Sequence, residues 1–214
     1  MHSVQQYNKE GVGGIIRLTK NEVRSASEVL ARALYDDPQT AYVYPNISER
    51  NKRLKHVFEL ILRFGVLYGE VYATSENLEG IAVWVRSEKA EITLPKMIRC
   101  GDVLLLWKMG WNIYKGYKPL TDYIEMKHKH YAPFRHWYLD PIGVEPQCQG
   151  KGHGGKLICY IISRADEERL PIYLYTTKES NVRLYEHYGF KVVGYGELPG
   201  TGVPYWSMVR ISTE

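Results

Sequence analysis

The sequence is poor in the residues and runs that mark several specialised classes of protein. It has three cysteines and ten prolines in 214 residues. Its most apolar stretch, Val103 to Trp111, is broken by Lys108 and Gly110 and falls well short of the roughly 20 residues of a membrane-spanning helix. The first residues lack the apolar centre of a secretory signal. These absences exclude collagen-like and low-complexity chains, and they predict a soluble, cytoplasmic protein that does not enter a membrane.

The cysteines, Cys100, Cys148 and Cys159, are odd in number and have no C-x-x-C spacing. This pattern predicts free thiols in a reducing compartment and argues against a disulfide framework or a zinc site. The Lys-His-Lys-His run at 127–130 also lacks the spacing of metal ligands, so we expect it to form a solvated face. The sequence therefore predicts no metal.

Charge is nearly balanced, with 28 Lys and Arg against 24 Asp and Glu and a net charge of +4. A protein that follows the phosphates of a nucleic acid would cluster its basic residues, so the balance argues against nucleic acid. It suits a small anionic ligand. The 18 tyrosines and five tryptophans are more unusual, and those between residues 107 and 134 are candidates for lining a ligand pocket.

A chain of this length suits one domain, which we expect to span residues 1–214. The spacing of Thr19 and Glu22 fits a capping box before the first helix, and Gly143 is a natural position for a β-bulge. Periodicity predicts strands at 14–18, 70–74, 80–85, 137–144, 172–176, 191–196 and 205–211. It predicts helices at 23–34, 49–68, 102–114, 122–131, from the end of the loop at 155 to 169, and 181–188, with a short helix near Pro95. This order favours an α/β arrangement around a mixed sheet.

The most informative stretch is the loop Gln149-Gly-Lys-Gly-His-Gly-Gly-Lys156, between a predicted strand and a predicted helix. Glycines let the backbone approach a phosphate, and the unpaired N–H groups of a helix start point toward it. Two nucleotide motifs fit only superficially. The next strand carries no acid for a ribose hydroxyl, as an NAD site needs, and Leu157 stands where a Walker A loop has its hydroxyl. A third pattern, Gln-x-x-Gly-x-Gly, is satisfied by Gln149, Gly152 and Gly154.

With this pattern, the segment from Tyr138 to Leu157 resembles the acetyl-CoA-binding core of the GNAT acyltransferase superfamily. A second segment, Asn181-Val-Arg-Leu-Tyr-Glu-His-Tyr-Gly-Phe190, resembles that family's N-x-x-x-Y-x-x-x-G-F signature. The stretch around Trp137 to Gly155 and the late Pro-Tyr-Trp-Ser-Met208 resemble in particular the puromycin N-acetyltransferase branch. The close resemblance covers residues 136–210, whereas the first half is similar only in element order and at its Arg-Leu-Thr-Lys start.

The resemblance implies an α/β (α+β) fold with a mixed, mostly antiparallel sheet of about six to seven strands, flanked by helices and splayed at a bulged central strand. It implies that residues 136–210 form the acetyl-CoA-binding core and that residues 90–135 form a helical segment on the acceptor side. The implied reaction moves an acetyl group from acetyl-CoA to a primary amine, expected to belong to a small molecule. A monomer and a homodimer both remain open.

The resemblance also assigns residues to acetyl-CoA. The backbone N–H groups of Gln149, Gly152 and Gly154 would hold the pyrophosphate. The bulged strand would face the pantetheine arm, with a backbone N–H at Gly143 polarising the thioester carbonyl. Asn181 would bond a pantetheine amide, cap its helix, or both. The expected acetyl-CoA-binding residues are Ile142, Gly143, Val144, Gln149, Gly150, Lys151, Gly152, His153, Gly154, Gly155 and Asn181.

Tyr185 is the implied catalytic residue, because a nearby phenol can protonate the departing CoA thiolate. Its alternative role is packing against Phe190. The general base stays open between Asp140 and a water relay, with His136 and His153 as weaker candidates. Glu145 is expected to be solvated, and Asp122 and Glu125, with the aromatics of residues 90–135, are expected to bind the amine.

Two other functions fit the same residues. One is acetylation of a protein or peptide amine, which an open groove would favour over a narrow aromatic pocket. The other is a CoA-binding regulatory module without turnover, against which the presence of both Tyr185 and Asn181 counts.

Overall fold

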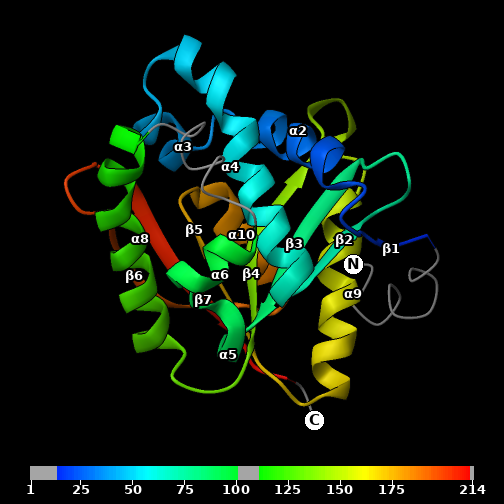
Figure 1. Ribbon diagram of the computed structural model, residues 1–214. Helices are drawn as coiled ribbons and strands as arrows, with labels where there is room; N and C mark the ends of the chain where they lie inside the picture. Colours follow the sequence, from blue (N-terminus) through cyan, green and yellow to red (C-terminus); the bar gives the residue numbers. More distant parts are fainter. Residues whose placement is uncertain (1–13, 101–110, 213–214) are drawn as a thin grey trace.

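A computed structural model describes residues 14–100 and 111–212 (Figure 1). Helices separate the strands of one sheet along the chain, except that the second and third strands, and the sixth and seventh, follow each other directly. The strands are β1 (Ile16–Arg17), β2 (Glu70–Ala73), β3 (Gly80–Arg86), β4 (Trp137–Val144), β5 (Ile172–Thr176), β6 (Lys191–Glu197) and β7 (Pro204–Arg210). The helices are α2 (Val23–Ala33), α3 (Pro38–Val43), α4 (Ile47–Tyr68), α5 (Ser87–Ala90), α6 (Leu94–Arg99), α8 (Trp111–Tyr131), a 3₁₀ turn η1 (Pro146–Cys148), α9 (His153–Glu167) and α10 (Glu179–His187).

The sheet has seven strands in the order β1-β2-β3-β4-β5-β7-β6, and every neighbouring pair except β4 and β5 is antiparallel. Helices α2 and α4 cover one face, where they contact Ile81 and Val83 of β3. Helices α9 and α10 cover the other face, where Ala82 and Trp84 of β3 point. The alternation of side chains along β3 therefore supplies both cores. The predicted fold class is confirmed.

Strands β4 and β5 separate soon after they meet. Their parallel pairing consists of Trp137 with Ile172 and Tyr138 with Tyr173. From Leu139 onward β4 has no partner in β5, although it stays paired with β3 as far as Val144. The predicted splay at the central strand is therefore present, and it leaves an opening in the middle of the sheet.

The bulge of β4 lies earlier than Gly143. Ala82 and Trp84 of β3 lie opposite Ile142 and Leu139 of β4, so β4 carries one extra residue within 140–141. The peptide bond between those two residues is cis. The bulge thus lies directly where β4 leaves β5.

Gly143 is instead in regular register, opposite Ile81. A Cβ atom on Gly143 would lie 2.8 Å from Cδ2 of Leu30 and 3.0 Å from Cβ of Ala33. The glycine therefore lets α2 lie directly against β4, and this close packing replaces the bulge as its structural role.

The helices match the expectations unevenly. Thr19 and Glu22 do contact each other through the Thr19 backbone N–H, at 2.8 Å, but α2 begins only at Val23. The sequence prediction missed α3, whose start is capped by Asp37 with a proline at the first helical position. The predicted helix at 122–131 is the end of the longer helix α8. The one predicted at 102–114 falls largely outside the described residues.

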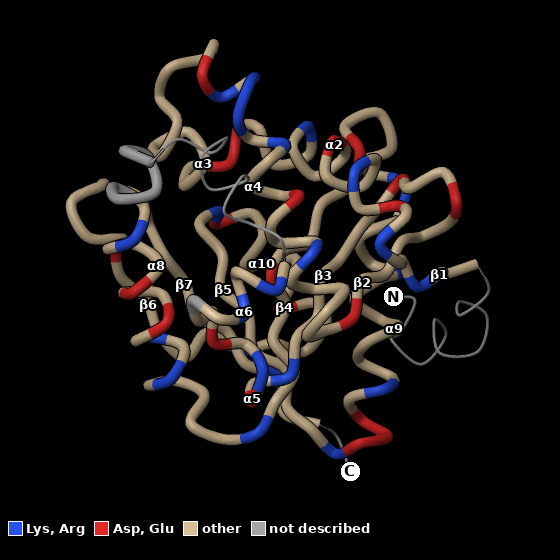
Figure 2. Tube along the Cα trace, in the orientation of Figure 1, with Lys and Arg blue, Asp and Glu red and all other residues tan. Residues whose placement is uncertain are grey.

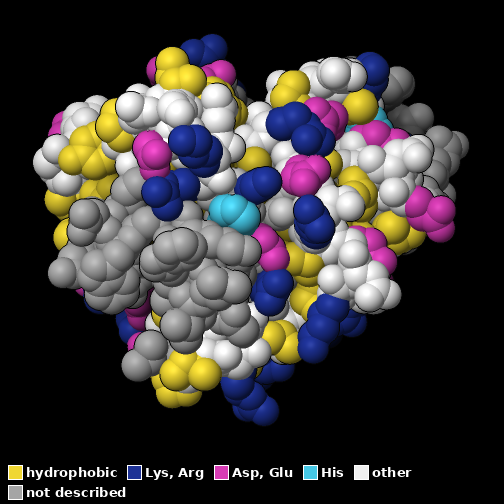
Figure 3. All heavy atoms as spheres, turned by 45° about the horizontal axis from the view of Figure 1, so that its top comes forward, with side chains coloured by type: hydrophobic (Ala, Val, Ile, Leu, Met, Phe, Trp, Pro, Cys, Tyr) yellow, Lys and Arg dark blue, Asp and Glu magenta, His cyan; other side chains and the backbone are white. Residues whose placement is uncertain are grey.

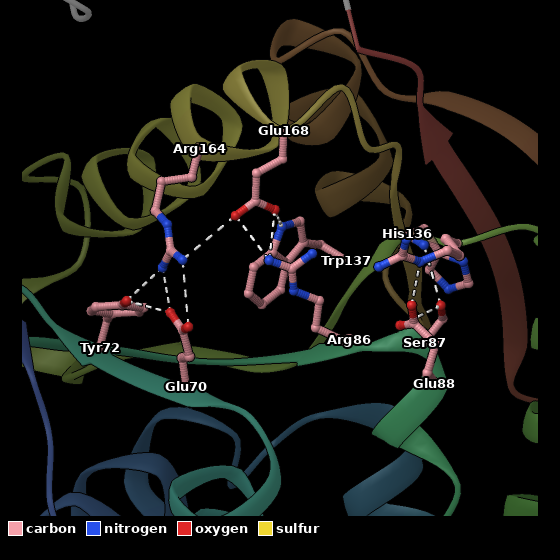
Figure 4. Close-up of polar contacts among 10 residues, drawn as sticks. Glu70, Tyr72, Arg86, Ser87, Glu88, His136, Trp137, Arg164 and Glu168 are labelled. Atoms are coloured by element: carbon pink, nitrogen blue, oxygen red, sulfur yellow. Dashed lines mark hydrogen bonds and ion pairs between the residues drawn. The ribbon is translucent and has the colours of Figure 1, made fainter.

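A cluster of polar side chains fixes the far end of α9 against the sheet (Figure 4). Arg164 forms an ion pair with Glu70 of β2. Glu168 pairs with Arg86 of β3 at 2.9 Å and accepts a hydrogen bond from the Trp137 indole at 2.9 Å. These contacts hold the C-terminal end of α9 against β2, β3 and β4. Because the two ends of a helix are joined by continuous backbone hydrogen bonds, the same contacts also position the glycine-rich start of α9 relative to β4.

Two buried histidines join the end of α8 to the start of β4. His136 contacts the Phe134 carbonyl oxygen through Nδ1 at 2.6 Å, so this nitrogen carries the proton and Nε2 is an acceptor. The partner at that Nε2, 2.6 Å away, is Nε2 of His128, which must then be the donor. His128 also stacks on Tyr173 with ring centroids 4.5 Å apart. The prediction of a solvated 127–130 run is wrong for His128, whereas His130 is exposed.

This pair predicts a loss of stability in mild acid. Burial lowers the pKa of His128 to about 3 and also lowers that of His136, below the usual 6.5. Below pH 6.5 these two histidines are protonated in the unfolded chain but stay neutral in the folded protein. The free energy of unfolding therefore falls as pH drops below 6.5. One such histidine costs about 1.4 kcal/mol between pH 7.5 and 5.5. Thermal melting at both pH values should show this difference shrinking in His128→Gln but not in His130→Gln. Equal shrinkage in both variants would contradict the assignment.

Candidate active site

A cavity of about 150 Å³ occupies the opening between β4 and β5. Its lining comes from α3, α4, β4, β5 and α10, and from Tyr117 of α8. Among the described residues the lining has two carboxylates, Asp37 and Asp140, and no basic side chain. The lining residues are Leu34, Asp37, Gln39, Thr40, Val43, Tyr44, Leu54, Val57, Phe58, Ile61, Tyr117, Leu139, Asp140, Pro141, Ile142, Tyr175, Thr176, Thr177, Asn181 and Tyr185.

The hydrogen-bond pattern of β4 decides which backbone groups face this opening. The N–H of Glu145 donates to the carbonyl of Glu79 at 2.8 Å, on the β3 side. Backbone groups alternate in direction along a strand, so Gly143 also faces β3, whereas Ile142 and Val144 face the open side. The geometry favours Ile142, next to the bulge and in the cavity lining, as the donor to a thioester carbonyl. The expectation that Gly143 supplies this N–H does not fit the register.

The glycine-rich loop ends in a helix start that is free to bind an anion. The N-cap of α9 is Gly152, which has no side-chain cap, and the first turn contains no acidic residue. The first intrahelical bond runs from Lys156 N to Gly152 O at 3.0 Å, so the N–H groups of residues 153–155 have no acceptor within the helix. Gly150 and Gly152 have positive φ angles and open space where a Cβ would stand. These features suit a diphosphate.

Two polar side chains of the loop at 149–156 form hydrogen bonds to the residues just before it. Gln149 donates from its side chain to Val144 O at 3.1 Å and from its backbone to Pro146 O at 3.4 Å. The exposed Lys151 donates to Gln147 O at 3.1 Å. His153 contacts the Thr74 hydroxyl at 3.2 Å. Gly155 is required for packing, because a Cβ there would lie 2.3 Å from the Tyr188 hydroxyl.

Gly154 is the cleanest position for testing the loop. A Cβ atom there would meet only Val144 Cγ2, at an ordinary 3.6 Å, so Gly154→Val should fold. The added methyl groups would stand where a diphosphate approaches the helix start. We expect calorimetry to show affinity for CoA lowered at least about tenfold, or 1.4 kcal/mol, with a smaller loss for Gly154→Ala. Unchanged affinity in a folded Gly154→Val protein would rule out diphosphate binding at this turn.

Tyr185 projects from α10 to the cavity. It is 5% exposed, packs edge-on against Phe190 at 5.7 Å, and has no hydrogen-bond partner for its hydroxyl among the described residues. Burial, and then the Asp37 carboxylate, raise its pKa well above the usual value of 10, so the phenol keeps its proton. Asn181 also lines the cavity and donates to the Thr176 hydroxyl at 3.2 Å. It lies inside α10, whose N-cap is Lys178, so the capping role expected for Asn181 is wrong.

Asp140 is the carboxylate at the bulge. Burial raises its pKa to about 6, while the Tyr138 hydroxyl acts in the opposite direction. Burial and then the Asp140 charge raise the pKa of the Tyr117 and Tyr175 phenols, which also line the cavity. A carboxyl group with a pKa near 6 is mostly ionised at neutral pH and can accept a proton there. His136 does not line the cavity, whereas the geometry keeps Asp140 as a base candidate.

The side of the cavity formed by α3 was not foreseen from the sequence. Gln39 of α3 donates to the Tyr117 hydroxyl at 2.9 Å and accepts from the Tyr175 hydroxyl at 3.2 Å. Asp37 accepts the backbone N–H of Gln39 at 3.0 Å and the Thr177 hydroxyl at 3.2 Å. These bonds hold α3 against β5 and α8. The Asp-Pro pair at 37–38 is a helix-start signal that could have revealed the element.

The expected acceptor segment, residues 90–135, is described only in part, because residues 101–110 and the side chains of 111–116 lie outside the described part of the chain. Within the described residues only Tyr117 of this segment reaches the cavity. Asp122 pairs with Lys118 at 2.7 Å and Glu125 with Lys129 at 2.7 Å, both along α8 and away from the lining. Glu145, expected to be solvated, forms an ion pair with Arg32 of α2 at 2.7 Å. Helices α3 and α4 supply most of the wall instead.

Comparison with known proteins shows what this chain is similar to. Residues 116–192 match the family described as acetyltransferase (GNAT) domain. This part of the chain is similar to GNAT acetyltransferase domains. It is 27% identical over 189 residues, 81% of this chain and 72% of the relative, to an uncharacterised N-acetyltransferase of Schizosaccharomyces pombe. The family match and this relative identify the protein as an acyltransferase.

Solved structures share the GNAT fold along almost the whole chain. A histone acetyltransferase HPA2 and related acetyltransferase from Corynebacterium glutamicum superposes with a TM-score of 0.65 at 20% identity, covering 94% of this chain and 97% of that one. A polyamine N-acetyltransferase from Drosophila melanogaster gives a TM-score of 0.58 at 14% identity, covering 92% and 98%. At these identities the likeness concerns the fold.

Metal-binding and membrane-spanning features concern the described ranges, 14–100 and 111–212. Within them, His, Cys, Asp and Glu form no group of three or more that could hold a metal ion. No helix in the same part of the chain is long and apolar enough to span a bilayer. None of Cys100, Cys148 and Cys159 forms a disulfide bond.

Proposed function

We propose that the protein transfers the acetyl group of acetyl-CoA to the primary amine of a small molecule. The observation that carries this proposal is the cavity in the opening between β4 and β5, lined by Tyr185 on one side and by Asp140 at the bulge. The uncapped start of α9 supplies N–H groups for the diphosphate of CoA. Asn181 and the open backbone edge of β4 suit the amides of the pantetheine arm. The residues present therefore fit the co-substrate.

The reaction that fits these positions is direct attack of the amine on the thioester. The nitrogen forms a bond to the carbonyl carbon, and the bond from carbon to sulfur breaks. Ile142 N–H stabilises the charge on the carbonyl oxygen. Asp140 takes one proton from the nitrogen and Tyr185 gives one to the sulfur, so the products are a neutral amide and a thiol. Exchange with water then returns both side chains to their starting forms.

The resemblance to the puromycin N-acetyltransferase branch enters this proposal only in part. It covers residues 136–210, which hold the loop, β5 and α10. The opposite wall comes from α3 and α4, outside that range. We propose that the branch resemblance describes CoA binding, and that the acceptor is decided by the other wall.

The test is release of CoA thiol from acetyl-CoA over a panel of small amines, puromycin and an unacetylated peptide. Acetylation of a small amine supports the proposal. Acetylation of the peptide alone would replace it with protein N-acetylation. A rise in melting temperature with acetyl-CoA but no transfer to any amine would instead support a regulatory CoA-binding module. Stronger stabilisation by NAD or Mg-ATP than by acetyl-CoA would show that the loop binds a different nucleotide.

A further inference from the structure

The cavity has one polar, charged side and one apolar side. One side has the Asp140 carboxylate with the hydroxyls of Tyr117 and Tyr175 near it. The side formed by α4 has only apolar side chains. These are Leu54, Val57, Phe58 and Ile61. A ligand that fills this space therefore meets a negative charge at one point and hydrocarbon along another wall.

The second carboxylate, Asp37, is already compensated. It caps the start of α3, where the helix dipole is positive, and accepts the Gln39 N–H and the Thr177 hydroxyl. Asp140 receives the Tyr138 hydroxyl but has no ion-pair partner among the described residues. Among the described lining residues, Asp140 is thus the carboxylate that lacks both a cation and a helix start to balance its charge.

From this arrangement we infer the class of acceptor, on the basis of the proposed function. The acceptor is a singly charged primary amine whose ammonium group enters beside Asp140 and whose uncharged, apolar body lies against Val57, Phe58 and Ile61 of α4. The ammonium gives its first proton to water, the neutral amine then attacks the thioester, and Asp140 takes the second proton. A diamine or polyamine is excluded by the same wall, since its second ammonium would face hydrocarbon there. Burying an unpaired charge costs several kcal/mol.

The volume of the cavity limits the size of the acceptor amine. A dry apolar cavity of about 150 Å³ holds a molecule the size of benzene. The space here is about 150 Å³, and the acetyl group takes part of it. The body of the acceptor is therefore a short alkyl chain or a single ring.

Selection by charge has to occur inside the cavity. The face that carries α3 and α4 shows basic and acidic side chains interspersed (Figure 3), and the charged residues alternate in sign along much of the described trace (Figure 2). Such a mixed surface gives no strong attraction to a dication over a monocation. The difference between the two must come from the lining residues.

A matched pair of probe amines tests the inference. Pentylamine and 1,5-diaminopentane have the same carbon chain and differ by one terminal ammonium group. We expect kcat/KM for pentylamine to exceed that for the diamine at least about tenfold at pH 7.5, from the cost of burying the second charge. Equal values, or a preference for the diamine, would overturn the inference.

A charge on the α4 wall should reverse this preference. Val57 lines the cavity and is only half-buried, so polar variants there should fold. Val57→Asp should raise the ratio of diamine to pentylamine turnover at least about tenfold, because the new carboxylate pairs with the second ammonium. Val57→Asn, which has the same shape without the charge, should leave the ratio near the original value. A ratio that moves equally in both variants would show that charge on this wall does not select the acceptor.

Different results would contradict the proposed acetyl transfer and the proposed class of acceptor. Transfer from acetyl-CoA to both probes at equal rates overturns only the acceptor class. Acetyl-CoA binding with no transfer to pentylamine or any other amine of the panel overturns the proposed function as well.

Discussion

Tyr185→Phe is expected to lower kcat by roughly 10² to 10⁴ while the KM for acetyl-CoA changes little. The variant removes only the hydroxyl, so the ring still packs against Phe190 and α10 keeps its position. The lost step is protonation of the departing thiolate. Because thiols titrate near pH 8.5, the thiolate is a fair leaving group even without that proton, and some activity should remain. Steady-state kinetics with a saturating amine measures the effect.

The control is Tyr160→Phe, at a half-buried tyrosine on α9 that does not line the cavity. It should keep the original kcat. The alkaline side of the pH profile should change in Tyr185→Phe only, because burial and Asp37 have raised the pKa of this phenol and its titration is removed. Wild-type turnover by Tyr185→Phe, under conditions where chemistry limits the rate, would reduce this residue to packing and leave water as the proton donor.

The sheet could be predicted from the sequence because its strands are short, β-branched and separated by turn residues. Residues 80–85 are an example, since the run is buried on both faces and β3 was placed within one residue. The order of elements after residue 136 was equally clear, because the resemblance and the periodicity agreed. The opening between β4 and β5 came from the resemblance, as no local pattern records where two strands separate.

Other features depended on packing that the sequence does not display. Gly143 was taken for the bulge, but its missing side chain serves contact with α2, and the extra residue lies at 140–141. His128 stands in a run of charged residues that looks solvated, yet it is buried against Tyr173. Asp122 and Glu125 had the right charge for an amine, but in the fold they pair with Lys118 and Lys129 along α8. In each case tertiary contacts decided what local composition left open.

Asp140→Asn is expected to lower kcat/KM by roughly 10² to 10⁴, the usual range for loss of a general base. The amide keeps the shape of the side chain but cannot take the proton from the amine. In the original protein kcat/KM should rise with pH through about 6, where burial has placed the pKa of this carboxyl, and the variant should lose that rise. A pH–rate profile of both proteins measures it. An unchanged profile in the variant would assign the base to water.

The free energy of unfolding of Asp140→Asn provides the control. Replacing a buried carboxylate that is costly to ionise should stabilise the protein, whereas replacing a carboxylate that supports the fold should destabilise it. Burial raises the pKa of Asp140 from 3.8 to about 6. Between those values the unfolded chain loses its proton first, so Asp140 lowers stability as pH rises from 4 to 6, and the full penalty persists above 6. Asp140→Asn should therefore be more stable than the original protein at pH 7.5, by the order of 1 to 3 kcal/mol, and no more stable at pH 4. Thermal melts of both proteins at both pH values distinguish the two roles. If the carboxylate supported the fold, Asp140→Asn would be less stable than the original protein at pH 7.5. Slower turnover in a protein that has become more stable is the combination expected of a residue kept for chemistry.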